Sequence, residues 1–113
     1  MPIVYKIFRS NEYANFLRDG RTKGAPVDLQ DGYVHMSTAD QVEVTASKYF
    51  QGEHGLKLLG IETDDLGPEL KWEPSRGGAL FPHLYRELLA EDVTFVRDLP
   101  FEDGRHRFKG LLA

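Results

Sequence analysis

A nearly unbroken apolar run from Leu56 to Thr63 restricts the possible folds of this chain more than any other stretch. Its apolar residues do not alternate with polar ones, which is typical of a central strand covered on both faces. Such a strand needs helices or a second sheet packed on each side. The run therefore predicts a domain built around a sheet.

Further strands are expected where β-branched and aromatic residues concentrate, and helices where apolar residues repeat at helical spacing. The expected strands span residues 3–8, 33–36, 56–63, 70–73 and 92–99, with a closing strand around 106–109, and the expected helices span 10–18 and 39–50. This order predicts an α+β domain with a curved sheet of five to six short strands and two main helices. The stretch from Arg21 to Gln30 shows no period, so we expect a surface loop able to fold over a site.

Composition narrows the classes of function. A chain of 113 residues predicts one domain spanning 1–113, and the absence of cysteine excludes disulfides, thiol catalysis and thiolate metal sites. A net charge of −4 makes extended nucleic-acid binding unfavourable, because each phosphate contact needs a Lys or Arg. No run predicts a membrane span or a signal peptide, so a cytoplasmic protein is expected. The acidic cluster Glu62, Asp64 and Asp65 lacks the spacing of a calcium loop, and no metal is expected.

The stretch D-G-Y-V-H-M-S-T-A, from Asp31 to Ala39, predicts a turn, a short strand and a helix start. Strand alternation places Val34 and Met36 on the core side and Tyr33, His35 and Ser37 on the other side. Ser37 or Thr38 is a suitable N-cap, and Gln41 completes a capping box with Thr38. Because a helix N-terminus favours anions, this stretch predicts a site for an anionic ligand.

A second stretch, from Ser75 to Tyr85, combines adjacent glycines with an arginine, a histidine and a tyrosine. Gly77 and its neighbour allow close backbone approach to a ligand, and Arg76 can hold a carboxylate or phosphate with two parallel hydrogen bonds. His83 is equally compatible with a bracing role. Outside both stretches, Lys6 interrupts an otherwise apolar strand, which is typical of an edge or snorkelling lysine and less often of a ligand contact.

These motifs resemble a known bacterial family. The stretch Asp31 to Ala39, the run L-K-L-L-G-I-E after it, and W-E-P-S-R-G-G-A-L-F-P-H-L-Y from Trp72 to Tyr85 resemble the family called domain of unknown function nine-five-two. The resemblance implies an ADP-ribosyltransferase-like fold, a curved split sheet that binds NAD in a cleft. The layout of the chain also resembles, more distantly, the RNA 2′-phosphotransferase branch of that superfamily. Where the first strand of that branch has histidine-glycine-threonine, this chain has Tyr5-Lys6-Ile7. The set of catalytic arginines of that branch is not evident either.

Three hypotheses follow. In the first, the cleft binds NAD or an ADP-ribosyl compound, His35 acts as acid or base, and Glu73 stabilises an oxocarbenium ion during glycosyl or ADP-ribosyl transfer. The second is a non-catalytic binding module for a small anionic ligand, and in the third the polar residues only brace two loops. The expected ligand-binding residues are Lys6, Tyr33, Ser37, Thr38, Ser75, Arg76, Gly77, His83 and Tyr85. The sequence does not decide among these hypotheses, nor does it indicate the oligomeric state.

Overall fold

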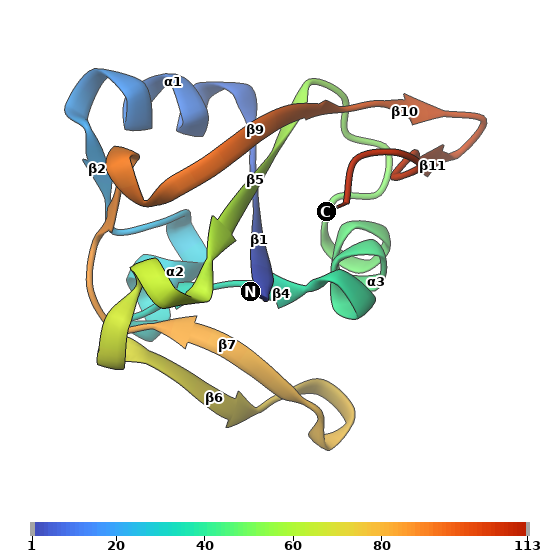
Figure 1. The fold of residues 1–113 in the computed structure, drawn as a ribbon. Helices are drawn as coiled ribbons and strands as arrows, with labels where there is room; N and C mark the ends of the chain where they lie inside the picture. The colour runs from blue at the N-terminus through green and yellow to red at the C-terminus, as the bar shows by residue number, and fades with distance from the viewer. Residues whose placement is uncertain (1, 113) are drawn as a thin grey trace.

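The computed structural model describes residues 2–112 and shows an α+β arrangement of short antiparallel sheets and three helices within that range. The main sheet has the order β4-β1-β5-β9 (Figure 1). Its strands are β1 (Ile3–Phe8), β4 (Ser37–Thr38), β5 (Leu56–Glu62) and β9 (Val93–Leu99), and every pair is antiparallel. As predicted, β5 lies inside this sheet, between β1 and β9.

A second sheet of three strands lies apart from the main one, with the order β3-β7-β6. It consists of β3 (Val34–His35), β7 (Leu80–Leu84) and β6 (Leu70–Pro74), and the β6–β7 hairpin lies below the main sheet in Figure 1. Two further pairs join β2 (Arg21–Thr22) to β8 (Leu88–Leu89), and β10 (Phe101–Glu102) to β11 (Arg105–His106). The expected closing strand thus lies at β11, slightly earlier than residues 106–109.

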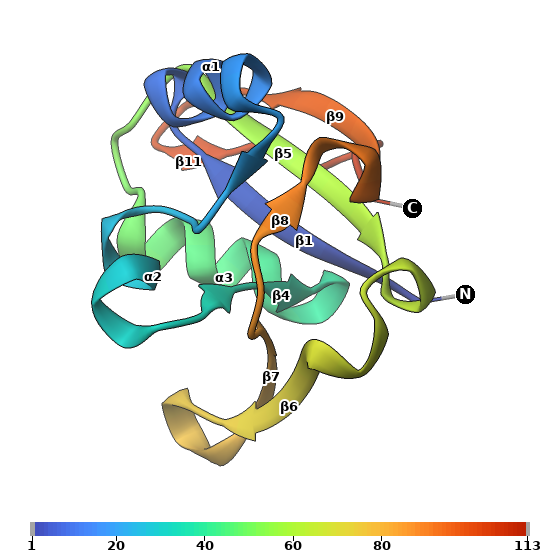
Figure 2. The same ribbon diagram turned by 90° about the vertical axis from the view of Figure 1, so that its left-hand side faces the viewer.

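Two of the helices match the sequence prediction. Helix α1 (Ser10–Asp19) ends at Gly20, whose φ of 73° is the left-handed conformation that glycine tolerates best. Helix α3 (Ala39–Tyr49) begins with the predicted capping box, because the Thr38 N–H donates to Gln41 Oε1 at 3.0 Å. In Figure 2, α3 continues directly from β4.

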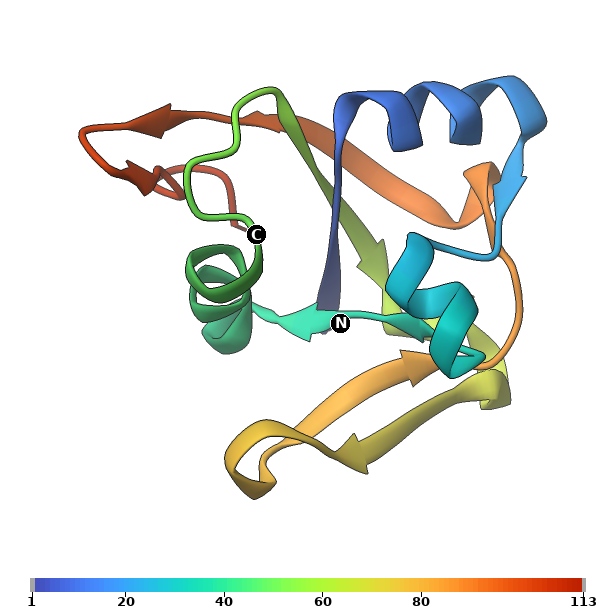
Figure 3. The same ribbon diagram turned by 180° about the vertical axis from the view of Figure 1, so that it is seen from behind.

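The third helix corrects the prediction of a surface loop over residues 21–30. That stretch contains β2 and the helix α2 (Pro26–Asp31), which lies between α1 and the β6–β7 hairpin in Figure 3. Its apolar residues Val27 and Leu29 are more than half exposed, whereas Asp28 is buried. A helix that buries a carboxylate and exposes its apolar residues has no recognisable amphipathic pattern.

The core lies on both faces of β5, as the apolar run predicted. Leu59 and Ile61 pack in one cluster with Phe16 of α1, and Leu56 and Leu58 pack in a second cluster on the other face. The second cluster also contains the buried residues Val42 and Ala46 of α3. Within the described residues, no helix is long and apolar enough to cross a membrane.

Candidate functional site

The strand β3 presents polar rings to a pocket. Val34 and Met36 are buried in the core, while Tyr33, His35 and Ser37 line a pocket of about 670 Å³, so the predicted alternation is confirmed. We call this hollow the main pocket; its lining also includes Lys6, Ser75 and His83. Residues from the first strand and from both motif stretches therefore meet at one place.

Antiparallel pairing of β3 with β7 brings the two motif stretches together. His35 and His83 are direct partners in this pairing, and their ring centroids lie 5.4 Å apart. Tyr33 contacts both rings, with centroid distances of 4.6 Å to His35 and 4.2 Å to His83. The wall of the main pocket is thus a cluster of three rings.

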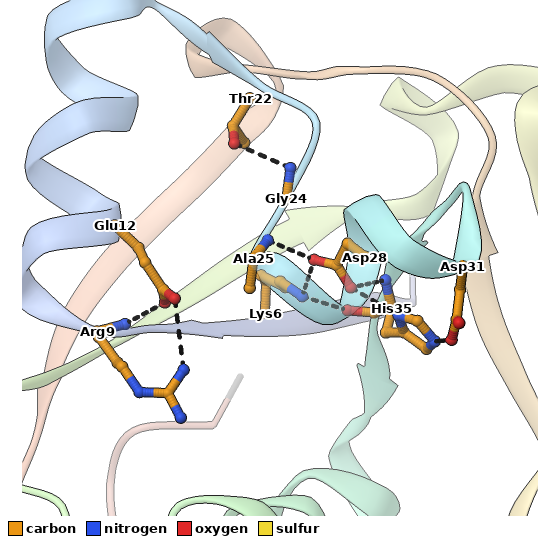
Figure 4. A network of polar contacts seen from close by, with 9 residues as sticks. All are labelled: Lys6, Arg9, Glu12, Thr22, Gly24, Ala25, Asp28, Asp31 and His35. Carbon is orange, nitrogen blue, oxygen red and sulfur yellow. Dashed lines mark hydrogen bonds and ion pairs between the residues drawn. The ribbon is translucent and has the colours of Figure 1, made fainter.

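Asp28 is the centre of the polar network beside this wall (Figure 4). Its Oδ2 accepts hydrogen bonds from Lys6 Nζ at 2.7 Å and from the Ala25 N–H at 2.8 Å. Its Oδ1 accepts from the His35 N–H at 3.0 Å and lies 2.6 Å from His35 Nδ1. Asp31, at the end of the same helix, places Oδ2 3.0 Å from His35 Nε2. The ring of His35 is therefore held between two carboxylates of α2.

Lys6 differs from the prediction of an edge or snorkelling lysine. β1 is an interior strand, and the Lys6 side chain is 7% exposed in its ion pair with Asp28. Lys6 Nζ also donates to the His35 carbonyl at 2.9 Å, which ties the main sheet to β3. A buried charge requires such a partner, because an unpaired one would lose its hydration without compensation.

The contacts with Lys6 and His35 lower the pKa of Asp28. Burial raises the pKa of the Asp28 carboxyl, but the hydrogen bond from His35 and the charge and hydrogen bond of Lys6 outweigh it, so the pKa lies below its usual range. Asp28 is therefore ionised near neutral pH. A carboxylate only accepts hydrogen bonds, so the Nδ1 of His35 must be the donor in this contact.

A second carboxylate–histidine pair lies on the neighbouring strands. Glu73 Oε1 is 2.8 Å from His83 Nδ1 and accepts a hydrogen bond from the Tyr85 hydroxyl at 2.6 Å. These hydrogen bonds, from Tyr85 first and then from His83, lower the pKa of Glu73, and the Glu73 bond raises the pKa of Tyr85 to about 12. Glu73 is thus ionised and engaged by two side chains.

Some predicted ligand-binding residues lie away from the main pocket. Thr38 does not line it, and its N–H is taken by Gln41, so the predicted phosphate site at the start of α3 is not formed by this group. Gly77 is also absent from the lining; it takes a left-handed turn with φ of 67°. Tyr85 lines a smaller hollow of about 330 Å³ that shares Tyr33 with the main pocket. The side chain of Arg76 lies outside the described part of the structure.

Glu73 does not occupy the position that its predicted catalytic role requires. It is absent from the lining of the main pocket and reaches the site only through His83. An oxocarbenium ion must be stabilised by direct contact, so this placement does not supply the expected carboxylate.

Three charged residues of the site are not among those predicted from the sequence: Asp28, Asp31 and Arg9. Arg9 lines the main pocket, pairs with Glu53 at 2.7 Å and lies over the ring of Phe50. Arg9 follows the predicted strand over 3–8, Asp28 lies inside the predicted loop and Asp31 comes directly after it, so no spacing pattern distinguishes these residues. The described residues contain no group of three or more side chains suited to hold a metal ion.

Comparison with known proteins gives the family. The model of the family described as "Protein of unknown function (DUF952)" matches residues 7–96. The chain belongs to this family. The matched DUF952 region contains the residues of the site except Tyr5 and Lys6, and the contact between Asp28 and His35 and the pair Glu73–His83 both lie within it.

Solved structures support the same relationship. The X-ray crystal structure of protein CC0527 from Caulobacter crescentus is 45% identical, with 95% of each chain covered and a TM-score of 0.91. The solution NMR structure of CC0527 is 46% identical, covers 100% of this chain and 98% of that chain, and has a TM-score of 0.88. No curated protein matches the chain.

Proposed function

We propose that the main pocket of this DUF952 protein binds a nucleotide, with NAD or an ADP-ribose-like compound as the first candidate. The observation that carries the proposal is the lining of the pocket. Its volume of about 670 Å³ is that of a small-molecule site, and tyrosine and phenylalanine side chains form much of its lining. These are Tyr5, Tyr33, Tyr49, Phe50 and Phe81. Aromatic walls with a few polar groups suit a planar base joined to a sugar and phosphate.

The position of the pocket between the sheets supports the same ligand class. Lys6 and Ser37 come from the main sheet, whereas His35 and His83 come from the second sheet. A cleft between two parts of a split sheet is what the ADP-ribosyltransferase-like resemblance implies for an NAD site. We include that fold assignment in the proposal.

The polar groups of the pocket favour a second candidate, a binding module without turnover. Lys6 is paired with Asp28, Arg9 is paired with Glu53, and His35 contacts carboxylates at both ring nitrogens. Groups that are already engaged can recognise a ligand without changing it. Because Glu73 is displaced from the lining, ADP-ribosyl transfer has less support from this geometry than nucleotide binding has.

Thermal unfolding with added NAD, ADP-ribose or AMP tests the binding proposal, since a ligand that binds the native state raises its stability by mass action. The pocket variant is Tyr49→Ala, because Tyr49 is 57% exposed on α3 and lines the main pocket. Val44→Ala is the matched control, since Val44 is 53% exposed on the same helix and does not line the pocket. We expect Tyr49→Ala to weaken nucleotide binding by roughly tenfold, consistent with a lost stacking contact, and Val44→Ala to leave it unchanged.

Two results would count against the proposal. One is the absence of any stabilisation by the three nucleotides at millimolar concentration, and the other is equal binding by Tyr49→Ala and the native chain. Nicotinamide release from NAD, followed by chromatography, separates the two candidates, because a binding module releases none.

A further inference from the structure

The two histidines of the site are held in the same way by different carboxylates. Asp28 contacts Nδ1 of His35 at 2.6 Å, and Glu73 contacts Nδ1 of His83 at 2.8 Å. The two rings are partners across β3 and β7 and both line the main pocket. A carboxylate that fixes Nδ1 sets the tautomer and orientation of an imidazole, as in acid–base catalysis.

The hydrogen-bond pattern determines which nitrogen of His83 is reactive. Because the Glu73 carboxylate only accepts, Nδ1 carries the proton and Nε2 of the neutral ring keeps a lone pair. His83 is 4% exposed, and its Nε2 has no hydrogen-bond partner among the residues that the structure describes. A nitrogen with a lone pair, on a ring that lines an open pocket, is suited to accept a proton from a bound molecule.

His35 is suited to the opposite role, that of a proton donor. It contacts two carboxylates, Asp28 and Asp31, whereas His83 contacts one, so both ring nitrogens of His35 face hydrogen-bond acceptors. Asp31 is 40% exposed at the mouth of the site, and a ligand oxygen can replace it beside Nε2. The site thus holds a proton donor and a proton acceptor with ring centroids 5.4 Å apart.

We propose that His35 and His83 form a general acid–base pair that hydrolyses a phosphodiester bond of a nucleotide bound in the main pocket. This inference rests on the proposed nucleotide binding and adds a reaction to it. His83 Nε2 takes a proton from water while the water oxygen bonds to phosphorus. The bond from phosphorus to the leaving ester oxygen breaks, and that oxygen takes the proton of His35 Nε2. The products are a phosphomonoester and an alcohol, and exchange with solvent restores both rings.

The chemistry of the leaving group favours this reaction over cleavage of NAD at its glycosidic bond. Nicotinamide leaves NAD as a neutral molecule and needs no proton, so an acid beside it would have no role. An ester oxygen leaves as an alkoxide and is stabilised strongly by a proton donor. Glu73, the carboxylate expected to stabilise the glycosidic transition state, is bound to His83 and Tyr85 and does not line the pocket.

Adenosine 2′,3′-cyclic phosphate is the probe, and chromatography follows its conversion to AMP. The variants are His35→Gln and His83→Gln, because glutamine can still donate to the carboxylate but cannot shuttle a proton. His54→Gln is the matched control, since His54 packs against Phe101 and lines neither pocket. We expect each pocket variant to lose at least about 100-fold in rate, the control to keep the native rate, and added imidazole to restore part of the activity of His83→Ala.

Binding and turnover are measured on the same preparations, so the two proposals can fail separately. Binding of AMP by the native chain without hydrolysis of the cyclic phosphate would overturn the acid–base pair and leave nucleotide binding intact. Hydrolysis that persists in His35→Gln, whose ring is 31% exposed and whose replacement perturbs the core little, would also overturn it. Absence of both binding and hydrolysis would remove both proposals. A variant that no longer unfolds cooperatively is set aside in favour of the other histidine, which tests the pair by itself.

Discussion

Replacement of Asp28 by asparagine should destabilise the protein more than any other single change of one charge in the site. The Asp28 side chain is 0% exposed and that of Lys6 is 7% exposed, so asparagine leaves a buried ammonium group without a counter-charge. Removal of one partner from a buried ion pair typically costs about 3–5 kcal/mol. Total stability of a domain this size is about 5–15 kcal/mol, so the loss is a large fraction of it.

Urea unfolding followed by circular dichroism measures this loss. With a slope of roughly 2 kcal/mol per molar urea, the midpoint should fall by about 2 M. Addition of Lys6→Met to Asp28→Asn should recover part of the stability, because the second change removes the unpaired ammonium group. The exposed pair Arg18–Asp19 supplies the matched control, and Asp19→Asn should leave the midpoint unchanged.

The reasoning would be refuted by a loss below about 1 kcal/mol for Asp28→Asn. It would also be refuted if the effects of Lys6→Met and Asp28→Asn added within about 0.5 kcal/mol, because independent sites behave in that way. Either result would mean that water reaches this pair and that its burial does not matter.

Three further measurements test the electrostatics and the packing. Because the folded pKa of Asp28 lies below the ordinary value of about 3.9, its stabilisation is complete above about pH 4 and is lost as pH falls through the folded value. Unfolding titrations between pH 5 and about pH 2 should show this loss, and Asp28→Asn should flatten it. The hydrogen bond to Glu73 raises the pKa of Tyr85 to about 12, so the stabilisation from this bond is complete below about pH 10 and is lost as the pH rises through about 12. When phenolate absorbance is followed at high pH, Tyr85→Phe should remove the tyrosine that ionises near pH 12. Gly60→Ala should cost about 1–3 kcal/mol in urea unfolding, because its Cβ would lie 2.2 Å from the Phe95 ring, and Phe95→Ala in the same chain should relieve part of that cost.

The main elements could be predicted because their patterns are local. The run in β5, the alternation of Val34 and Met36 against Tyr33 and His35, and the capping box at the start of α3 each involve neighbouring residues. A local period reports which side of an element is buried, and burial dominates the energy of these elements. The positions of these elements therefore follow from the sequence within one or two residues.

The centre of the site could not be predicted, because its contacts join residues that no local pattern relates. Asp28 lies in a helix of six residues, too short for a hydrophobic period, and its partner Lys6 belongs to another element. The pairing of His35 with His83 depends on the register between β3 and β7, which are far apart in the chain. The burial of Lys6 could not be predicted for the same reason, because a lysine in an interior strand needs a carboxylate partner, and that partner, Asp28, belongs to another element.

The carboxylates of Asp28 and Glu73 connect the site to different parts of the protein. Helix α2 is too short to be stable alone, and Asp28 fixes it to β1 through Lys6 while it orients His35. A change at Asp28 therefore alters stability and site geometry together. Glu73 is partly exposed on β6 and holds only side chains, His83 and Tyr85, so its replacement should disturb the site with little loss of stability. A comparison of Glu73→Gln with Asp28→Asn thus separates the part of the site that the fold requires from the part that is present for the ligand.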